Sequence, residues 1–247
     1  MNSIDNIRTL FSKKLKNKDF VVDKNGGYTL ELIGDSFIAN EEVIFGKLNQ
    51  DYAEKELQWY KSQSLNVYDI PKTPQIWRNV SDKDGNINSN YGWCIYSKEN
   101  GEQFKNAVRE LRKNKDSRRA SMIYTRPTMH TDYNVNGMSD FICTNAVTFE
   151  IRDNKLHCVV QMRSSDILSG YKNDRFWHNI VLTEVYLELI KDYPELQIGD
   201  IIWNSASLHI YQHQFFLVFH YAMTGEKTIS RKKFEETYDV ELLSWYK

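Results

Sequence analysis

Residues 141–163, FICTNAVTFEIRDNKLHCVVQMR, decide the fold of this chain. The two ends of this stretch are rich in β-branched, aromatic and other apolar residues, whereas its centre, 152–155, is polar. This pattern is typical of two β-strands joined by a tight turn. We therefore predict strands over 141–151 and 156–163, with Cys143 inside the first of them.

The flanking sequence adds strands and helices that do not alternate regularly. A short alternating run begins at Thr29 and ends at Gly34, which predicts a strand. Other strands are predicted over 120–125, 201–204 and 208–219, and helices over 4–15, 51–61, 103–112 and from Asp174 to shortly before Pro194. Residues 64–90 are expected to be mostly loop. The mixture predicts an α+β fold, and the lack of a linker-like stretch predicts one domain, 1–247.

The composition excludes several classes of protein. The 247 residues include 32 basic and 33 acidic side chains, a net charge of −1, which argues against a protein that coats nucleic acid. No apolar run is long enough for a membrane-spanning helix. Three widely spaced cysteines do not make a disulfide framework. We therefore expect a reduced, cytoplasmic protein that requires neither a membrane nor nucleic acid.

Common cofactor motifs are absent. The sequence contains no P-loop, glycine-rich dinucleotide fingerprint, paired Cys-x-x-Cys or nucleophile elbow. His209 and His213 are four residues apart on a predicted strand and so share a face, but no third ligand accompanies them. We therefore predict no metal site.

Three polar features remain as candidates. Arg118 and Arg119 precede a predicted strand, where paired arginines can bind a phosphate; the alternative is a solvated surface pair. Arg163 and Ser164 end a strand and suit an oxyanion, or else belong to a polar loop with an arginine–aspartate pair. Cys143 is an inert core residue unless cationic neighbours activate its thiol as a nucleophile.

These features belong to an ordered series of motifs. In chain order the series is Glu56-Leu57-Gln58-Trp59, Asn90-Tyr91-Gly92, Ser117-Arg118-Arg119, Cys143, Arg163-Ser164-x-Asp166 with Gly170, residues 199–203, and His209-Ile210-Tyr211. The series resembles the thymidylate synthase family and, within it, the branch of deoxycytidylate (dCMP) 5-hydroxymethylases from T-even bacteriophages. The resemblance covers residues from about 18 to about 225, most of the chain.

The resemblance implies a fold and a catalytic pair. It implies a thymidylate synthase-like α+β domain, a mixed β-sheet covered by helices, with one face of the sheet forming a homodimer interface. It implies Cys143 as the nucleophile and Glu56 as a proton-handling residue. The co-substrate implied is 5,10-methylenetetrahydrofolate, with Asp166, Tyr91 and Trp93 as its expected contacts.

The resemblance also implies a set of nucleotide contacts. The substrate-binding residues expected from it are Lys24, Arg118, Arg119, Arg163, Ser164, His209 and Tyr211. Arg118 and Arg119 would reach the phosphate bound by the partner subunit, and His209 and Tyr211 would hold the sugar 3′-hydroxyl. Lys24 stands where the synthases have arginine, so it keeps the charge without the bidentate geometry.

One departure from the family bears on the choice of base. The synthases have asparagine eleven residues after the arginine of the Arg-Ser-x-Asp motif, and this chain has Asp174. An amide matches the donor and acceptor edge of uracil. A carboxyl group instead accepts from the exocyclic amine of cytosine and shares a proton with its ring nitrogen. Asp174 therefore favours dCMP as substrate, and the alternative role for this residue is a helix N-cap.

A second departure bears on the reaction. Residues 242–247, LLSWYK, lack the small apolar ending with which the synthases close over folate and exclude water. We therefore expect water capture, giving 5-hydroxymethyl-dCMP and tetrahydrofolate, and a host-cytoplasmic location if the chain is viral. The alternatives are a thymidylate synthase or hydroxymethylase acting on dUMP, and a non-catalytic nucleotide-binding protein.

Overall fold

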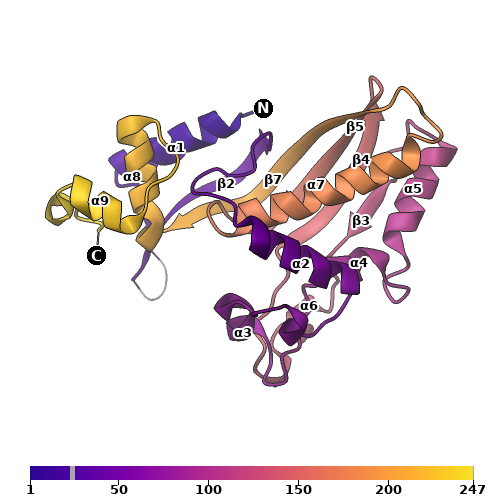
Figure 1. Ribbon diagram of the computed structural model, residues 1–247, viewed down its shortest axis with the longest axis horizontal. Coiled ribbons are helices and arrows are strands. Elements are labelled where there is room, and N and C mark those ends of the chain that lie inside the picture. Colours follow the sequence, from indigo (N-terminus) through magenta and orange to yellow (C-terminus); the bar gives the residue numbers. More distant parts are fainter. Residues whose placement is uncertain (23–25, 247) are drawn as a thin grey trace. The chain divides into compact units, whose positions relative to one another are not determined.

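The computed structural model describes residues 1–22 and 26–246 (Figure 1). The chain divides into two compact units. Unit 1 consists of Met1–Leu48, Arg163–Phe176 and Ile202–Lys247, and unit 2 consists of Asn49–Met162 and Trp177–Ile201. Lys24, expected to contact the phosphate, lies outside the described residues.

The helices and strands are distributed over both units. Unit 1 contains α1 (Ile4–Lys16), β1 (Val21–Val22), β2 (Tyr28–Ile38), β6 (Ser165–Asp166), α8 (Phe215–Thr224) and α9 (Arg231–Thr237). Unit 2 contains α2 (Gln50–Ser62), α3 (Gln75–Val80), α4 (Tyr91–Tyr96), α5 (Gln103–Lys113), β3 (Ser121–Ile123), α6 (Met129–Asp132), β4 (Thr144–Arg152) and β5 (Lys155–Met162). Helix α7 (Gly170–Leu189) and strand β7 (Gln197–Tyr211) contribute residues to both units. Short 3-10 turns occupy Val67–Asp69, Val135–Gly137, Gln212–Gln214 and Val240–Leu242.

The sheet of unit 1 is built around β2. This strand pairs antiparallel with β1 and with β7, and β6 adds to β7 in parallel. The predicted strand from Thr29 does not end at Gly34: it continues to Ile38, because Gly34 accommodates a φ of +68° inside the strand. The parallel pairing of β6 with β7 places Asp166 opposite His209.

Helix α1 closes the core of unit 1. The Ser3 side chain accepts a hydrogen bond from the backbone N–H of Asn6 and caps the first turn. Ile7 and Phe11 are fully buried on one face, and α1 packs against α8. On the same helix the buried Arg8 donates two hydrogen bonds to the Glu41 carboxylate. These bonds anchor the loop that follows β2.

The β4–β5 hairpin forms the centre of unit 2, as the sequence predicts. The two strands pair antiparallel from Thr144↔Met162 to Arg152↔Lys155, and β3 pairs with the other edge of β4. Figure 1 shows β4 and β5 side by side, with α5 beside β3. The hairpin turn has positive φ at Asp153 and Asn154, residue types that tolerate this conformation.

Several predicted boundaries are wrong. The first strand of the hairpin begins at Thr144, so Cys143 immediately precedes it. The predicted strand over 208–219 ends at Tyr211, and the apolar residues that follow form helix α8. An apolar run of this length does not distinguish a buried strand from a buried helix. Residues 64–90 are mostly loop, as predicted, and include the short helix α3.

The long helix also begins earlier than the sequence pattern indicates. α7 starts at Gly170, four residues before Asp174. The Asp166 carboxylate accepts hydrogen bonds from the backbone N–H groups of Leu168 and Ser169, which fixes the turn that leads into the helix. Among the described helices, none is long and apolar enough to cross a membrane.

Candidate active site

The residues predicted to form the site divide between the two units. Unit 2 holds Glu56, Tyr91, Trp93, Arg118, Arg119 and Cys143. Unit 1 holds Arg163, Ser164, Asp166, Asp174, His209 and Tyr211.

Cys143 occupies the turn that leads into β4. Its Sγ lies 3.9 Å from the backbone oxygen of Phe141, and the residue is half-buried. The other two cysteines, Cys94 and Cys158, are buried, and burial raises the pKa of both thiols, that of Cys94 to about 12. Cys143 is therefore the thiol best suited to react with a ligand.

The loop before Cys143 is tied to the segment before α4. The buried Asp140 carboxylate accepts hydrogen bonds from the backbone N–H of Asn88 at 2.6 Å and of Ser89 at 2.9 Å, and from the Ser89 hydroxyl. Arg126 donates to the Asn88 side chain at 2.9 Å. These bonds limit the freedom of the loop that carries Cys143.

Glu56 lies on α2 and is only 5% exposed. Its Oε1 accepts hydrogen bonds from the Tyr52 hydroxyl and from Trp77 Nε1, the latter at 3.0 Å. Burial raises the pKa of this carboxyl, and the two donors partly oppose that shift. A buried carboxyl with a raised pKa is suited to exchanging protons near neutral pH.

Sequence reasoning missed Tyr52 and Trp77. Tyr52 precedes Glu56 by four residues on α2, a helical spacing that could have identified it. Trp77 lies on α3, inside the segment predicted as loop, where no motif drew attention to it.

The Tyr91-Gly92 motif begins a short helix held against α2. The Asn90 side chain accepts from the backbone N–H of Trp93 at 2.8 Å, and its amide donates to the Trp59 backbone oxygen at 3.0 Å. Tyr91 is buried and stacks on Tyr60, with ring centroids 5.2 Å apart. A Cβ at Gly92 would lie 1.8 Å from the Tyr60 backbone oxygen, so only glycine permits this approach.

Trp93 presents an aromatic surface beside a positive charge. Its ring is half-buried, its Nε1 donates to Glu99 at 2.9 Å, and the Arg126 guanidinium lies 5.6 Å from the ring centroid. Arg126 also forms an ion pair with Asp132 at 3.0 Å. The arrangement offers a flat ring and a cation to a ligand that carries both an aromatic system and carboxylates.

Arg118 and Arg119 are exposed in the segment before β3. The Arg119 side chain is 75% exposed and reaches Glu110 of its own chain, with Nη2 2.9 Å from the carboxylate. Ser117 donates to the same Glu110 oxygen at 2.6 Å. An exposed ion pair of this kind contributes little stability and leaves the guanidinium accessible to an anion.

His209 is oriented by its neighbours in unit 1. Its Nδ1 lies 3.1 Å from the Ser207 hydroxyl, and that hydroxyl donates to Glu31 on β2. Because the Ser207 proton is directed at Glu31, its oxygen accepts the proton on Nδ1, and Nε2 keeps its lone pair in the neutral ring. The Tyr211 ring lies 5.1 Å from the His209 ring. No sequence motif identifies Ser207 or Glu31.

Asp174 lies in the second turn of α7, so its alternative role as a helix N-cap is wrong. Its Oδ2 is 3.7 Å from the position of a Cβ added at Gly170, and the Asp166 Cβ is equally close to that position. The side chains of both aspartates thus lie close to Gly170. Arg163 and Ser164 are half-buried between β5 and β6.

Comparison with known proteins identifies the family. The thymidylate synthase family model matches residues 45–237. The chain belongs to the thymidylate synthase family. The resemblance seen in the ordered motifs is therefore confirmed.

Individual members of the thymidylate synthase family differ widely in their similarity to the chain. The deoxycytidylate 5-hydroxymethyltransferase of Enterobacteria phage T6 is 50% identical, covering 94% of this chain and 96% of its own. The phage T4 enzyme of the same name is 49% identical, and the match covers 96% of this chain and 97% of the phage T4 enzyme. The thymidylate synthase of Buchnera aphidicola subsp. Schizaphis graminum is 25% identical, and the match covers 83% of this chain and 78% of that synthase.

A solved structure supports the thymidylate synthase-like fold. Thermostable thymidylate synthase A from Bacillus subtilis superposes with a TM-score of 0.64 at 21% identity, covering 90% of this chain and 84% of that one. The predicted α+β architecture, a mixed sheet with helices, is confirmed at this level.

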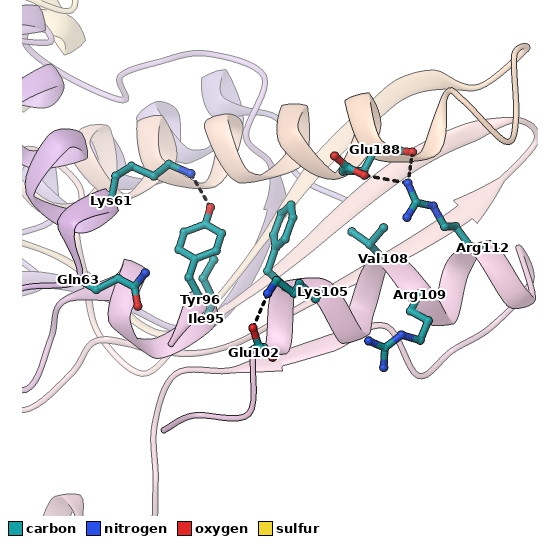
Figure 2. A pocket seen from close by; sticks show the side chains of 11 residues that line it. Lys61, Gln63, Ile95, Tyr96, Glu102, Lys105, Val108, Arg109, Arg112 and Glu188 are labelled. Carbon is teal, nitrogen blue, oxygen red and sulfur yellow. Dashed lines mark hydrogen bonds and ion pairs between the residues drawn. The ribbon is translucent and has the colours of Figure 1, made fainter. Parts of the chain in front are cut away.

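Unit 2 also contains a cavity of about 740 Å³ that is not lined by the predicted site residues. Figure 2 shows side chains that line it, among them Lys61, Tyr96 and Arg112. Its cations have partners: Lys61 contacts Glu184 at 2.5 Å, and Arg112 contacts Glu188 at 2.8 Å. None of the predicted site residues lines this cavity.

Proposed function

We propose that the chain is a deoxycytidylate 5-hydroxymethyltransferase, which converts dCMP, 5,10-methylenetetrahydrofolate and water into 5-hydroxymethyl-dCMP and tetrahydrofolate. The observation that carries the proposal is the identity of about 50%, over nearly the whole of both chains, to the phage enzymes of that name. We also propose that residues 1–247 act as one catalytic domain in the host cytoplasm.

Cys143 begins the reaction. Its thiolate adds to carbon 6 of the cytosine ring, and the electron pair released makes carbon 5 nucleophilic. The half-buried position of Cys143, on a loop tied down through Asp140, supports this role. Elimination of the thiolate at the end restores the ring and frees the product.

The co-substrate supplies a one-carbon unit at the oxidation level of formaldehyde. Tyr91, Trp93 and Asp166 are the proposed contacts. The half-buried Trp93 ring with the Arg126 guanidinium over it fits a flat pterin with an acidic tail. Asp166 is available as a hydrogen-bond acceptor, since two backbone N–H groups occupy only part of its capacity.

Glu56 handles protons during the later steps. Carbon 5 forms a bond to the methylene carbon of the co-substrate. Loss of the carbon 5 proton and cleavage of the bond from that carbon to the folate nitrogen release tetrahydrofolate and leave an exocyclic methylene, to which water adds. Glu56 accepts the proton of the attacking water. Its burial and raised pKa support a role in proton transfer near neutral pH.

The nucleotide is held by its phosphate, sugar and base. Arg163 and Ser164 bind the phosphate, and Arg118 and Arg119 reach it from the partner subunit of a homodimer. The exposed Arg119 side chain supports this role, although it must leave Glu110 to act.

The sugar and the base have their own contacts. The 3′-hydroxyl donates to His209 Nε2, whose lone pair is left free by the bond between Nδ1 and Ser207, and Tyr211 completes the contact. Asp174 accepts from the exocyclic amine of cytosine and shares a proton with the ring nitrogen.

Product identification tests the proposed reaction. The purified protein is incubated with 5,10-methylenetetrahydrofolate and either dCMP or dUMP, and the nucleotides are identified by mass spectrometry. We expect 5-hydroxymethyl-dCMP with unoxidised tetrahydrofolate. Thymidylate from dUMP together with dihydrofolate would refute the proposal, and no turnover of either nucleotide would favour a binding protein.

Subunit mixing tests the shared phosphate site. Inactive Cys143→Ala and inactive Arg119→Ala chains are mixed under conditions that exchange subunits. A heterodimer would contain one site with both functional residues, so activity should return to about a quarter of the wild-type level. Mixtures that stay inactive despite proven exchange would exclude the contribution across the interface.

A further inference from the structure

The two oxygens of the Glu56 carboxyl group have different surroundings. Oε1 accepts from the Tyr52 hydroxyl and from Trp77 Nε1. No residue in the described part of the chain donates to Oε2. Trp77 Nε1 is also 3.0 Å from the Tyr52 hydroxyl oxygen, so the three side chains form a closed triangle.

We propose that Tyr52 is a positioning residue for Glu56, which holds Oε1 as a permanent acceptor and thereby makes Oε2 the oxygen that exchanges protons with water during the reaction. This inference rests on the proposed function, in which Glu56 transfers protons. It adds to that function the identity of the reacting oxygen and a residue that controls it.

The direction of the Tyr52 proton follows from the triangle. The Trp77 N–H is a donor only, so the Tyr52 oxygen accepts from it. The carboxylate is an acceptor only when ionised, so the Tyr52 hydroxyl must donate to Oε1. Both donors favour the ionised form of Glu56, and both act on the same oxygen. A proton that arrives at the carboxyl group therefore finds free lone pairs on Oε2.

Other charges near Glu56 do not provide this control. On α2, Asp51 and Glu54 are exposed, and Lys55 forms an ion pair with Asp51. Arg78 on α3 is exposed. On α4, which packs against α2, the buried titratable groups are Tyr91 and Cys94, and burial raises the pKa of the Cys94 thiol to about 12. Burial and the two hydrogen bonds are what shift the pKa of Glu56.

The Tyr52→Phe variant tests the proposal. It removes one donor from Oε1 and keeps the ring. Loss of a hydrogen bond to a buried charged group should raise the pKa of Glu56 by about one to two units. Since water activation needs the carboxylate, the acidic limb of the kcat–pH profile should move up by the same amount. At pH values below the wild-type acidic limb kcat should fall about tenfold or more, and the deficit should shrink as the pH rises past the limb of the variant.

Two further variants make the result specific. Tyr68→Phe removes the hydroxyl of a tyrosine that is 58% exposed, and its profile should match the wild type. Trp77→Phe removes the second donor and should move the limb in the same direction as Tyr52→Phe, which keeps the test available if Tyr52→Phe does not fold. A kcat reduced equally at all pH values in both variants would overturn the proposal, because a structural role alone would produce that result.

A readout independent of turnover separates this inference from the proposed function. Infrared difference titration follows the carboxyl band that Glu56→Gln removes. We expect its midpoint to rise in Tyr52→Phe, and an unchanged midpoint would overturn the proposal. A raised midpoint in a protein that makes no hydroxymethylated product would support Tyr52 as the residue that positions Glu56 while refuting the proposed reaction.

Discussion

Replacing Gly92 with alanine should separate α4 from α2. An alanine Cβ would lie 1.8 Å from the Tyr60 backbone oxygen and 2.5 Å from its carbonyl carbon, whereas an ordinary contact begins near 3.4 Å. The obstacle is backbone, which no side-chain rotation can relieve. The two helices must therefore move apart by about 1.5 Å at this point.

The magnitude follows from packing. Forcing extra volume into a well-packed site costs about 1–3 kcal/mol, and the better helix propensity of alanine returns at most about 1 kcal/mol. We expect a net loss of about 2 kcal/mol, or about 4–8 °C in Tm for a chain of this size. The shift also moves Tyr91 and Trp93, and a misplacement of about 1 Å reduces turnover by about 100-fold.

The assay compares Gly92→Ala with Gly199→Ala. A Cβ at Gly199 would lie 2.9 Å from the Leu156 backbone oxygen, at the turn end of the hairpin, opposite the end that begins at Thr144. Both variants should lose stability in urea unfolding, but only Gly92→Ala should lose about 100-fold in kcat/KM for the folate substrate. Equal activities of the two variants, measured where both are folded, would refute the argument that this glycine positions α4.

Three further outcomes are expected. Arg8 lowers the pKa of Glu41 from 4.5 to about 2, so Glu41→Gln should cost up to about 3 kcal/mol at pH 7 in urea unfolding. Because the pKa of Glu41 is lower in the folded chain than in the unfolded chain, its carboxylate stabilises the fold at pH values above the unfolded pKa. The difference in the free energy of unfolding between Glu41→Gln and the wild type should therefore narrow as the pH falls from 4.5 towards 2. Asp174→Asn should raise the ratio of kcat/KM for dUMP over dCMP by about 100-fold or more, and an unchanged ratio would mean that this residue does not read the base. Iodoacetamide should label Cys143 in the folded protein, and peptide mass spectrometry should find the two buried cysteines unmodified.

The sequence was most informative where one face of an element is buried. The β4–β5 hairpin was predictable because Val147 and Phe149 alternate with polar residues and a polar turn follows. Helix α8 was not predictable in this way. Its residues Phe215, Leu217 and Val218 are all apolar, and their spacing fits a strand as well as a helix. Its helical state depends on packing against α1, which no local pattern encodes.

The candidate site shows the same limit for a different reason. Motifs identified Cys143 and Glu56, because their neighbours in the sequence are part of the family pattern. They did not identify Trp77, which donates to Glu56 on another helix, or Ser207, which donates to Glu31 on another strand. Such partners become visible only when the chain is folded.

The interleaved composition of unit 1 has a consequence for synthesis on the ribosome. β2 pairs with β7, and α1 packs against α8 as well as against β2, so residues 1–48 complete their contacts only after β7 and α8 have been made. At about 5–20 residues per second, the N-terminal segment waits on the order of ten seconds or more. Unit 2 ends at Ile201 and is completed earlier in translation. During that interval the face of α1 that packs against α8 and the edge of β2 that pairs with β7 lack these partners.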